Sequence, residues 1–303
     1  MVYFDPDAWR RNFYGAKNDE NWQYCRNLLI EIFNQTLAIV KDGGYMSGGT
    51  RVPISSSGMT SAFYRSPDAL PDGGERYNTE YSVIDSDSLN AAEALVKQGV
   101  YPCVLNMASR RNPGGGVING SGAQEENIFR RTNLFVSMYA FAEYAWQYER
   151  YGVKPSPNQY PLDWLSGGVY SGGVTVFRGD EASGYPLLAE PYKVAVVSVP
   201  AINCPHMTLR DGEPYIVDDE VPRARSKIRS ILRISALHGH DSLVLGAWGC
   251  GAFHNPPRHI ATLFKETFAE AEFAGRFKRV VFAIINRKGW ELENLRQFEE
   301  VFR

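Results

Sequence analysis

The chain alternates apolar, strand-like segments with amphipathic, helix-like segments from about residue 79 to its end, and this alternation restricts its fold most. The strands are predicted at 79–85, 101–109, 172–179, 192–201, 241–249 and 277–285. The helices are predicted at 88–99, 123–145, 221–239, 257–273 and 290–303. Near-continuously apolar strands separated by helices are typical of a buried, largely parallel sheet covered on both faces. We therefore expect an α/β fold, a three-layer α/β/α sandwich with a mixed, largely parallel sheet.

The segment that precedes this alternation has a different character. Residues 19–41 carry apolar side chains at helical spacing and are predicted to form a helix. Residues 43–76 are rich in Gly, Ser, Pro and Asp and are predicted to be irregular. Residues 150–166 contain several prolines and are predicted to form a surface insertion. We therefore divide the chain into an N-terminal helical extension, residues 1–76, that packs on a core domain, residues 77–303.

Composition and charge exclude several classes of protein. The formal net charge is −2, so we expect no broad basic surface for nucleic acid. No apolar run approaches the roughly 18 residues that a membrane-spanning helix needs. The N-terminus has no basic region followed by an apolar core, so we expect no signal peptide. We therefore expect a cytoplasmic protein without membrane association. We also expect it to be a monomer.

The cysteines and histidines give no pattern typical of a metal site. The four cysteines are far apart and form no C-x-x-C sequence, so free thiols are expected. The close histidine pairs, His238 with His240 and His254 with His259, lack the spacing of zinc-binding helices. We expect no metal and no other cofactor.

Two glycine-rich loops follow predicted strands, at 113–122 and at 246–251. Ligands in open α/β sheets bind beyond the carboxyl ends of the strands, so both loops are candidates for binding. Neither loop matches the dinucleotide-binding or Walker A glycine pattern, and no nucleophile elbow occurs in the chain.

The first loop leads into an acidic helix start, in the stretch "NPGGGVINGSGAQEEN" at 112–127. Glycines let backbone N–H groups approach a ligand, and a helix N-terminus near Gln124 attracts anions. Glu125 and Glu126 would then lie in the first helical turn beside that ligand. The same residues also fit an ordinary helix start, since Ser121-x-x-Gln124 matches a capping box. The residues alone leave both interpretations open.

The stretch "VLNMASRRNPGGGVINGSGAQEE" resembles the signature of microbial-type poly(ADP-ribose) glycohydrolases, in which a triple glycine precedes Gln-Glu-Glu inside a macrodomain. "VIDSDSLNAAEAL", "VVSVPAIN", "LVLGAWGCGAFHNPP" and "VVFAIINR" resemble further segments of that family in the same order. The resemblance covers most of the chain, and it implies a macrodomain-like fold.

The resemblance also implies roles for individual residues. It assigns catalysis to Glu126 and orientation of the ribose to Glu125. The remaining predicted substrate contacts are Asp87 on the adenine amine, Asn112, Gly115, Gly116, Val117 and Gln124 around the diphosphate and ribose, the amides of Gly249, Cys250 and Gly251 on the diphosphate, and Phe253 on the distal ribose. Asp87 also fits a helix cap, and Phe253 also fits a core aromatic.

The implied reaction is cleavage of the ribose–ribose bond of poly(ADP-ribose), which passes through an oxocarbenium-like centre. Glu126 would protonate the leaving oxygen and then act as base on the attacking water. Two alternatives stay open: a macrodomain that binds ADP-ribose without cutting it, and a hydrolase of mono-ADP-ribosyl conjugates on protein. Residues 43–76 and 150–166 could close the path past the terminal unit and restrict cutting to chain ends.

Overall fold

The computed structural model describes residues 4–73, 75–286 and 290–303. The chain forms two compact units. The first comprises the chain up to Ser61 together with 111–161 and 171–194, and the second comprises 62–110, 162–170 and 195–303. The catalytic loop predicted from sequence belongs to the first unit, and the second glycine-rich loop belongs to the second.

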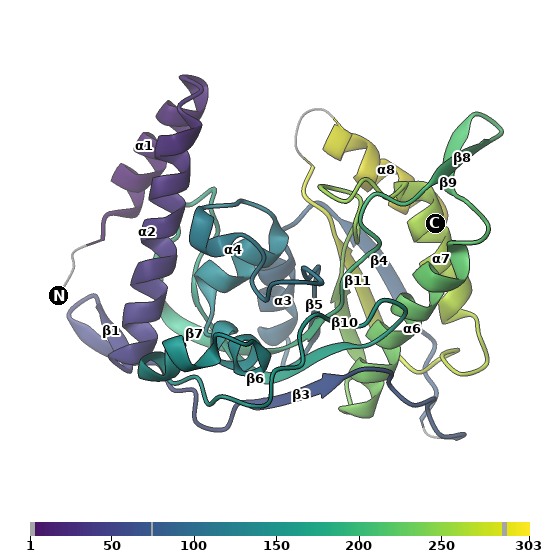
Figure 1. The fold of residues 1–303 in the computed structure, drawn as a ribbon, viewed down its shortest axis with the longest axis horizontal. Coiled ribbons are helices and arrows are strands. Elements are labelled where there is room, and N and C mark those ends of the chain that lie inside the picture. The colour runs from purple at the N-terminus through teal and green to yellow at the C-terminus, as the bar shows by residue number, and fades with distance from the viewer. Residues whose placement is uncertain (1–3, 74, 287–289) are drawn as a thin grey trace. The chain divides into compact units, whose positions relative to one another are not determined.

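The helices and strands follow the predicted alternation (Figure 1). The helices are α1 (Pro6–Asn18), α2 (Trp22–Lys41), α3 (Ser88–Val96), α4 (Gln124–Arg131), α5 (Phe135–Met138), α6 (Val221–Leu237), α7 (Pro257–Phe268) and α8 (Trp290–Phe302), with 3₁₀ turns η1 (Val117–Asn119), η2 (Tyr139–Phe141) and η3 (Ala145–Tyr151). The strands are β1 (Gly44–Ser47), β2 (Thr50–Pro53), β3 (Thr60–Tyr64), β4 (Glu80–Ile84), β5 (Cys103–Asn106), β6 (Gly168–Arg178), β7 (Leu187–Ser198), β8 (Met207–Arg210), β9 (Glu213–Ile216), β10 (Ser242–Leu245) and β11 (Arg279–Ala283).

The main sheet has the strand order β3-β6-β7-β5-β10-β11-β4, and β1-β2 and β8-β9 form separate antiparallel pairs. Strand β10 pairs in parallel with both β5 and β11, β11 pairs in parallel with β4, and β5 pairs in parallel with β7. The sheet is therefore mixed and largely parallel, as predicted. Parallel pairing brings the carboxyl ends of β5 and β10 to the same edge of the sheet.

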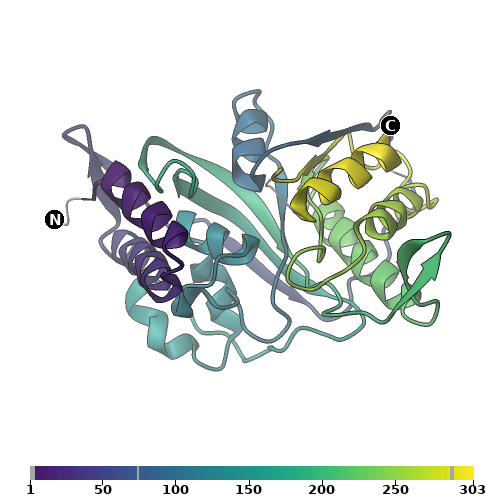
Figure 2. The same cartoon turned by 90° about the horizontal axis from the view of Figure 1, so that it is seen from above.

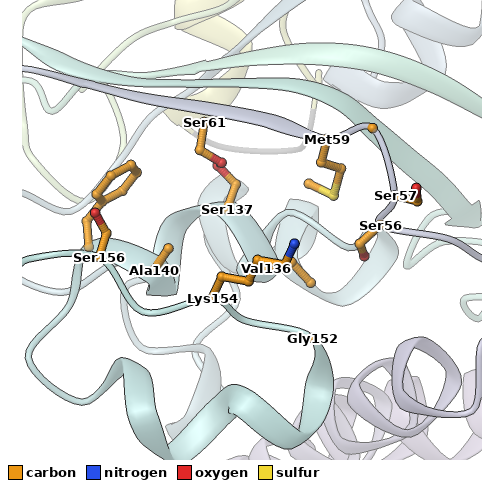
Figure 3. Close-up of a pocket in the computed structure, with 12 residues that line it drawn as sticks. Ser56, Ser57, Met59, Ser61, Val136, Ser137, Ala140, Gly152, Lys154 and Ser156 are labelled. Carbon is orange, nitrogen blue, oxygen red and sulfur yellow. The ribbon is translucent and has the colours of Figure 1, made fainter.

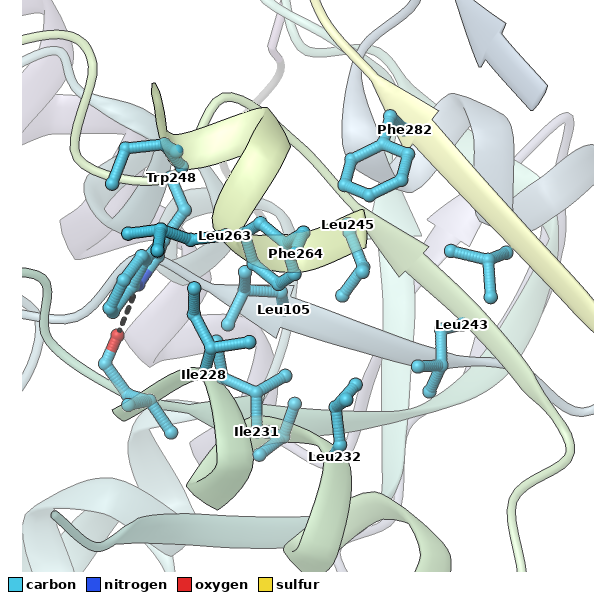
Figure 4. Close-up of a cluster of buried hydrophobic side chains, with 14 of the residues drawn as sticks. Leu105, Ile228, Ile231, Leu232, Leu243, Leu245, Trp248, Leu263, Phe264 and Phe282 are labelled. Carbon is cyan, nitrogen blue, oxygen red and sulfur yellow. Dashed lines mark hydrogen bonds between the residues drawn. The ribbon is translucent and has the colours of Figure 1, made fainter. Parts of the chain in front are cut away.

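Helices cover both faces of the sheet in the second unit. One face, which carries Leu105, Leu243 and Phe282, packs against apolar side chains of α6 and α7 (Figure 4) and also of α8. The other face packs against α3. Burial of each large aliphatic or aromatic side chain stabilises the folded state by roughly 1.5–3 kcal/mol. This core therefore holds β10, the strand that the second loop follows, firmly in place.

Helices α1 and α2 lie side by side in the first unit (Figure 2). Asp5 caps α1 through the N–H of Ala8, and Asn21 caps α2 through the N–H of Tyr24. Their apolar faces share a small buried cluster that includes Trp9. Helix α2 also contacts α4, so it supports the helix that follows the first glycine-rich loop.

Most predicted elements are confirmed, and two predictions of secondary structure were wrong. The predicted helix 123–145 ends at Arg131, because Thr132 is extended and its hydroxyl accepts from the N–H of Leu134 at 3.1 Å. Residues 43–76, predicted to be irregular, contain β1, β2 and β3. Helix α1 and the β8-β9 hairpin were not predicted, although Asp5 and Pro6 are typical of a helix start. The division into an extension to residue 76 and a catalytic domain stays a prediction.

Candidate active site

The first glycine-rich loop folds back on itself through consecutive tight turns. The N–H of Gly115 donates to the carbonyl of Asn112 at 2.9 Å, and the N–H of Val117 donates to the carbonyl of Gly114 at 3.0 Å. The chain then makes the turn η1 and enters α4 at Gln124, where the sequence places the helix start. Glu125 and Glu126 lie in its first turn, as predicted.

Both glutamate side chains point back to the loop and accept from its backbone. Glu125 Oε1 accepts from the N–H of Gly114 at 3.0 Å, and Glu126 Oε1 accepts from the N–H of Gly116 at 2.8 Å. Hydrogen bonds to ionised acceptors are among the stronger ones in proteins. The glycine loop therefore positions the two carboxylates before any substrate arrives.

The close approach of loop and helix explains the consecutive glycines. Gly115 has φ +55°, and a Cβ atom there would overlap Glu126 Oε1. A Cβ atom at Gly114 would lie 2.6 Å from Cε1 of Phe129 on α4. Only glycine gives this backbone both the left-handed conformation and the space for the carboxylates.

Glu126 is the chemically distinctive member of the pair. Its side chain is 6% exposed, and its second oxygen, Oε2, is buried with no hydrogen-bond partner among the described residues. Leaving a buried acceptor unpaired costs about 1–3 kcal/mol, so such an atom in a folded protein calls for an explanation. A carboxylate held at one oxygen and unpaired at the other is suited to proton transfer.

Arg130 holds the loop on the helix, and sequence reasoning missed it. This residue is fully buried and lies one turn after Glu126. Its guanidinium donates to the carbonyl of Ser121 at the end of the loop and to the carbonyl of Leu29 on α2 at 3.2 Å. The hydroxyl of Thr36 donates to the carbonyl of Arg130. The sequence shows only an arginine four residues after Glu126, and its burial could not be predicted from that.

The predicted capping box is wrong. The N-cap of α4 is Ala123, whose methyl group cannot accept a hydrogen bond. Ser121 is exposed, and its hydroxyl lies where a side chain on Gly116 would project. The extra residues between Ser121 and the helix form part of the loop, so Ser121 limits the space beside Gly116 instead of capping α4.

Aromatic side chains pack beside α4. The ring of Phe129 lies 5.7 Å from that of Tyr139. Burial raises the pKa of Tyr139 well above its usual value of 10, with smaller contributions from neighbouring tyrosines and from the charge of Glu125. The Tyr139 hydroxyl therefore stays neutral at physiological pH, and Glu125 lies close enough to influence it.

The second glycine-rich loop follows β10 and is held by a different chemistry. The side-chain amide of Asn255 donates to the carbonyls of Ile202, Gly249 and Phe253 at 2.7–3.2 Å. The indole N–H of Trp248 donates to the carbonyl of Val199 at 3.0 Å (Figure 4). Asn255 was also missed from sequence, although an asparagine before two prolines marks the end of the loop.

Cys250 lies in this second loop, and Phe253 follows it. The Cys250 thiol is buried, and burial raises its pKa, so it stays protonated and is a poor nucleophile. The N–H of Cys250 donates within the loop to the carbonyl of Ala247 at 3.0 Å. Phe253 is half-buried and packs against the core of the second unit.

Asp87 caps α3 in the second unit. Its Oδ1 accepts from the N–H groups of Leu89 and Asn90 at 2.9 and 3.2 Å. The capping role that the sequence offered as an alternative is therefore confirmed. Contact of Asp87 with an adenine amine stays a prediction.

A cavity of about 580 Å³ lies elsewhere in the first unit (Figure 3). Serine hydroxyls, the ammonium group of Lys154 and apolar side chains such as Met59 and Val136 line it. Ser61 and Ser137 hydrogen-bond to each other across its wall at 2.6 Å. Its described lining includes none of the residues predicted to act on substrate.

A mixed, largely parallel sheet with helices on both sides, and a glycine-rich loop leading from β5 to an acidic helix start, define a macrodomain-like α/β protein. The family model for the microbial-type poly(ADP-ribose) glycohydrolase (PARG) catalytic domain matches residues 34–179. The solved PARG from Thermomonospora curvata is 30% identical, with a TM-score of 0.69, over 90% of this chain and 98% of that chain.

Further solved structures agree with this assignment. The Thermomonospora curvata enzyme bound to the inhibitor ADP-HPD is 29% identical, with a TM-score of 0.68, over the same shares of the two chains. PARG from Deinococcus radiodurans, in complex with ADP-ribose as a T267R variant, is 28% identical, with a TM-score of 0.58, over 75% of this chain and 86% of that chain. The chain belongs to the microbial-type poly(ADP-ribose) glycohydrolase family and is an enzyme, a hydrolase of this type.

The chain matches no curated protein and contains no candidate membrane-spanning helix among its described residues. In the parts of the chain that the structure describes, no helix combines the length and apolar character that crossing a membrane requires.

Proposed function

We propose that this enzyme hydrolyses the ribose–ribose O-glycosidic bond of poly(ADP-ribose) and releases ADP-ribose, with Glu126 as general acid and base. The observation that carries the proposal is the state of Glu126, which is anchored at Oε1 by the N–H of Gly116 while Oε2 is buried and unpaired. Structures of related enzymes with ADP-ribose and with ADP-HPD support an ADP-ribosyl substrate.

In the proposed reaction, Glu126 carries a proton on Oε2 when the substrate is bound. The glycosidic C–O bond breaks as this proton passes to the leaving ribose oxygen, and positive charge develops at the anomeric carbon. Water then attacks that carbon and gives a proton back to Glu126, so the enzyme is regenerated. The N–H of Gly116 fixes the carboxylate through both steps without competing for Oε2.

Glu125 is proposed to orient the ribose beside Glu126. Asn112, Gly115, Gly116, Val117 and Gln124 are proposed to contact the diphosphate and the ribose. The N–H groups of Gly115 and Val117 donate within the loop and that of Gly116 donates to Glu126. We infer that these residues contribute close approach of a backbone without side-chain bulk, and that they are not free donors to phosphate.

For the second unit, we propose that the backbone of Gly249, Cys250 and Gly251 binds diphosphate, that Phe253 packs on the distal ribose and that Asp87 contacts the adenine amine. Asn255 supports these roles because it fixes the carbonyls of Gly249 and Phe253. The protein is proposed to act as a cytoplasmic monomer, without cofactor and without direct binding of nucleic acid.

Assays with two substrates distinguish the proposed function from its alternatives. We expect incubation with poly(ADP-ribose) to release free ADP-ribose, and incubation with mono-ADP-ribosylated protein to release none; both are measured by chromatography of the nucleotide products. Release from the mono-ADP-ribosylated protein alone would indicate a hydrolase of such conjugates. Binding of ADP-ribose without release from either substrate would indicate a protein that only binds it.

A further inference from the structure

An exposed tryptophan in the second unit is surrounded by cations. Trp164 is 57% exposed, and it lies on the segment that connects to β6. The guanidinium carbon of Arg223 lies 3.9 Å from the centre of its ring, and that of Arg110 lies 5.8 Å away. An exposed tryptophan ring with two arginines beside it offers an aromatic face and positive charge at one place on the surface, the two features that bind bases and phosphates of a nucleotide.

The positive charges of this cluster have few counter-charges. Arg223 pairs with Glu220 at 3.3 Å, but Arg110 and Lys227 have no carboxylate within 4.0 Å in the described part of the chain. Lys227 is only 2% exposed, and its ammonium group donates to the carbonyl of Asp163 at 3.4 Å. Burial and the neighbouring arginines lower the pKa of Lys227 to about 8, although Asp163 opposes the shift. An anionic ligand would relieve this repulsion.

Hydrogen bonds attach the segment that carries Trp164 to Arg110, which precedes the first glycine-rich loop in the chain. The N–H of Leu162 donates to the carbonyl of Arg110 at 2.8 Å, and the guanidinium of Arg110 donates to the carbonyl of Leu162 at 3.1 Å. The carboxylate of Asp163 accepts from the N–H groups of Leu165 and Ser166 and so stabilises the turn that presents Trp164. The cluster is therefore a preformed surface.

The chemistry of this cluster suits a ligand that carries an unpaired base next to phosphates. An exposed indole binds a base by stacking, and adjacent arginines bind phosphate oxygens and strengthen the field that attracts them. A polymer of ADP-ribose carries both groups in every unit. Arg110 precedes Asn112, at the start of the first glycine-rich loop, by two residues in the chain, which favours the enzyme's own substrate over an unrelated nucleic acid.

We propose that Trp164, Arg110, Arg223 and Lys227 bind an ADP-ribose unit of the polymer other than the one being cleaved. The adenine stacks on Trp164, Arg110 contacts the diphosphate, and the more deeply buried Arg223 and Lys227 supply positive potential. The surface gives the enzyme a preference for oligomers over single ADP-ribose units. This inference rests on the proposed function, since it assumes a polymeric substrate.

The test compares ADP-ribose oligomers of defined length with monomeric ADP-ribose, using the full chain carrying Glu126→Gln to prevent cleavage. We expect Trp164→Ala to weaken oligomer binding about tenfold, the size expected for loss of one base stack, and to leave monomer binding unchanged. Trp164→Phe, which keeps a ring, should restore most of the affinity. Trp146→Ala is the matched control, because Trp146 is 66% exposed and lies outside the cluster.

Arg110→Gln is a second variant, expected to reduce the dependence of oligomer affinity on salt. Unchanged oligomer affinity in Trp164→Ala, with monomer binding intact, would overturn the inference and leave the proposed function standing. Competition by single-stranded oligoadenylate RNA as strong as that by the oligomer would also overturn it, since the surface would then bind nucleic acid in general. Failure of the parent protein to bind monomeric ADP-ribose would contradict the proposed function itself, and the inference with it.

Discussion

The two glycine-rich loops of this enzyme are held in place by hydrogen bonds of opposite direction. In the loop before α4, backbone N–H groups of Gly114 and Gly116 donate to carboxylates. In the loop after β10, backbone carbonyls accept from the side-chain amide of Asn255. The first loop therefore positions two carboxylates, whereas the second is fixed through backbone carbonyls, its own and that of Ile202. Glycine content alone does not show what a loop positions; the groups that its amides and carbonyls contact do.

The largest effect within this comparison is expected for Gly115→Ala. The added Cβ overlaps Glu126 Oε1 and displaces the carboxylate, so kcat on the polymer should fall about 10²-fold, as misplacement of a catalytic group by about 1 Å can do. Gly48→Ala is the matched control, since Gly48 has φ +54° and no atom near its Cβ position. Equal loss of activity in both variants would mean that backbone strain, and not the carboxylate, is responsible.

A smaller effect is expected for Asn255→Ala in the second loop. Removal of the amide takes the side-chain donor from the carbonyl of Ile202 and one of two donors from the carbonyls of Gly249 and Phe253, which costs about 1–3 kcal/mol of stability. We expect KM for the polymer to rise several-fold while kcat changes little, because a loosened binding loop affects substrate and transition state alike. Steady-state kinetics on Asn255→Ala and on the exposed Asn203→Ala measure this, and a selective loss of kcat would argue for a catalytic role.

Low pH is expected to reduce the stability of the second unit by protonating His259 on α7. The Nδ1 atom of His259 accepts from the N–H of Ile216 at 3.0 Å, and burial lowers its pKa from 6.5 to about 4. Because the unfolded chain binds this proton more readily, the stabilisation is complete above pH 6.5 and is lost as pH falls towards 4. After allowance for solvent screening, the loss is about 1–2 kcal/mol.

Urea unfolding as a function of pH measures the effect. The variant His259→Asn can still accept from Ile216 and does not titrate, so its stability should depend less on pH over this range. A pH dependence equal to that of the unaltered protein would assign the acid sensitivity to other groups.

Much of the fold could be predicted because its signals are local. Apolar strands alternate with helices along the chain, and Asp87 caps α3 as its sequence suggests. The helix predicted through 123–145 failed because tertiary contacts prevailed over helical periodicity. The side chain of Asn133 bonds to the N–H of Thr175 at 2.8 Å, and Thr132 pairs with Val176, so this segment joins the strand β6 instead of extending α4.

The first glycine-rich loop and the start of α4 could be predicted, but not the hydrogen bonds between them. The spacing of the triple glycine and of Glu125 and Glu126 marked the loop and the start of α4. The sequence could not show that the loop's N–H groups bond to those carboxylates, because this depends on how the loop folds back over the helix. For the same reason Ser121 was assigned as a cap, although Ala123 occupies that position.

The central claim is that Glu126 transfers the proton, and one substitution tests it directly. Glu126→Gln keeps an oxygen to accept from Gly116 but cannot act as acid or base. We expect its affinity for ADP-ribose, measured by calorimetry, to be retained while turnover of poly(ADP-ribose) falls about 10²–10⁴-fold. Glu143→Gln, at an exposed glutamate of the same unit, should leave both unchanged. Turnover retained in Glu126→Gln would contradict the assignment of Glu126 as the general acid and base.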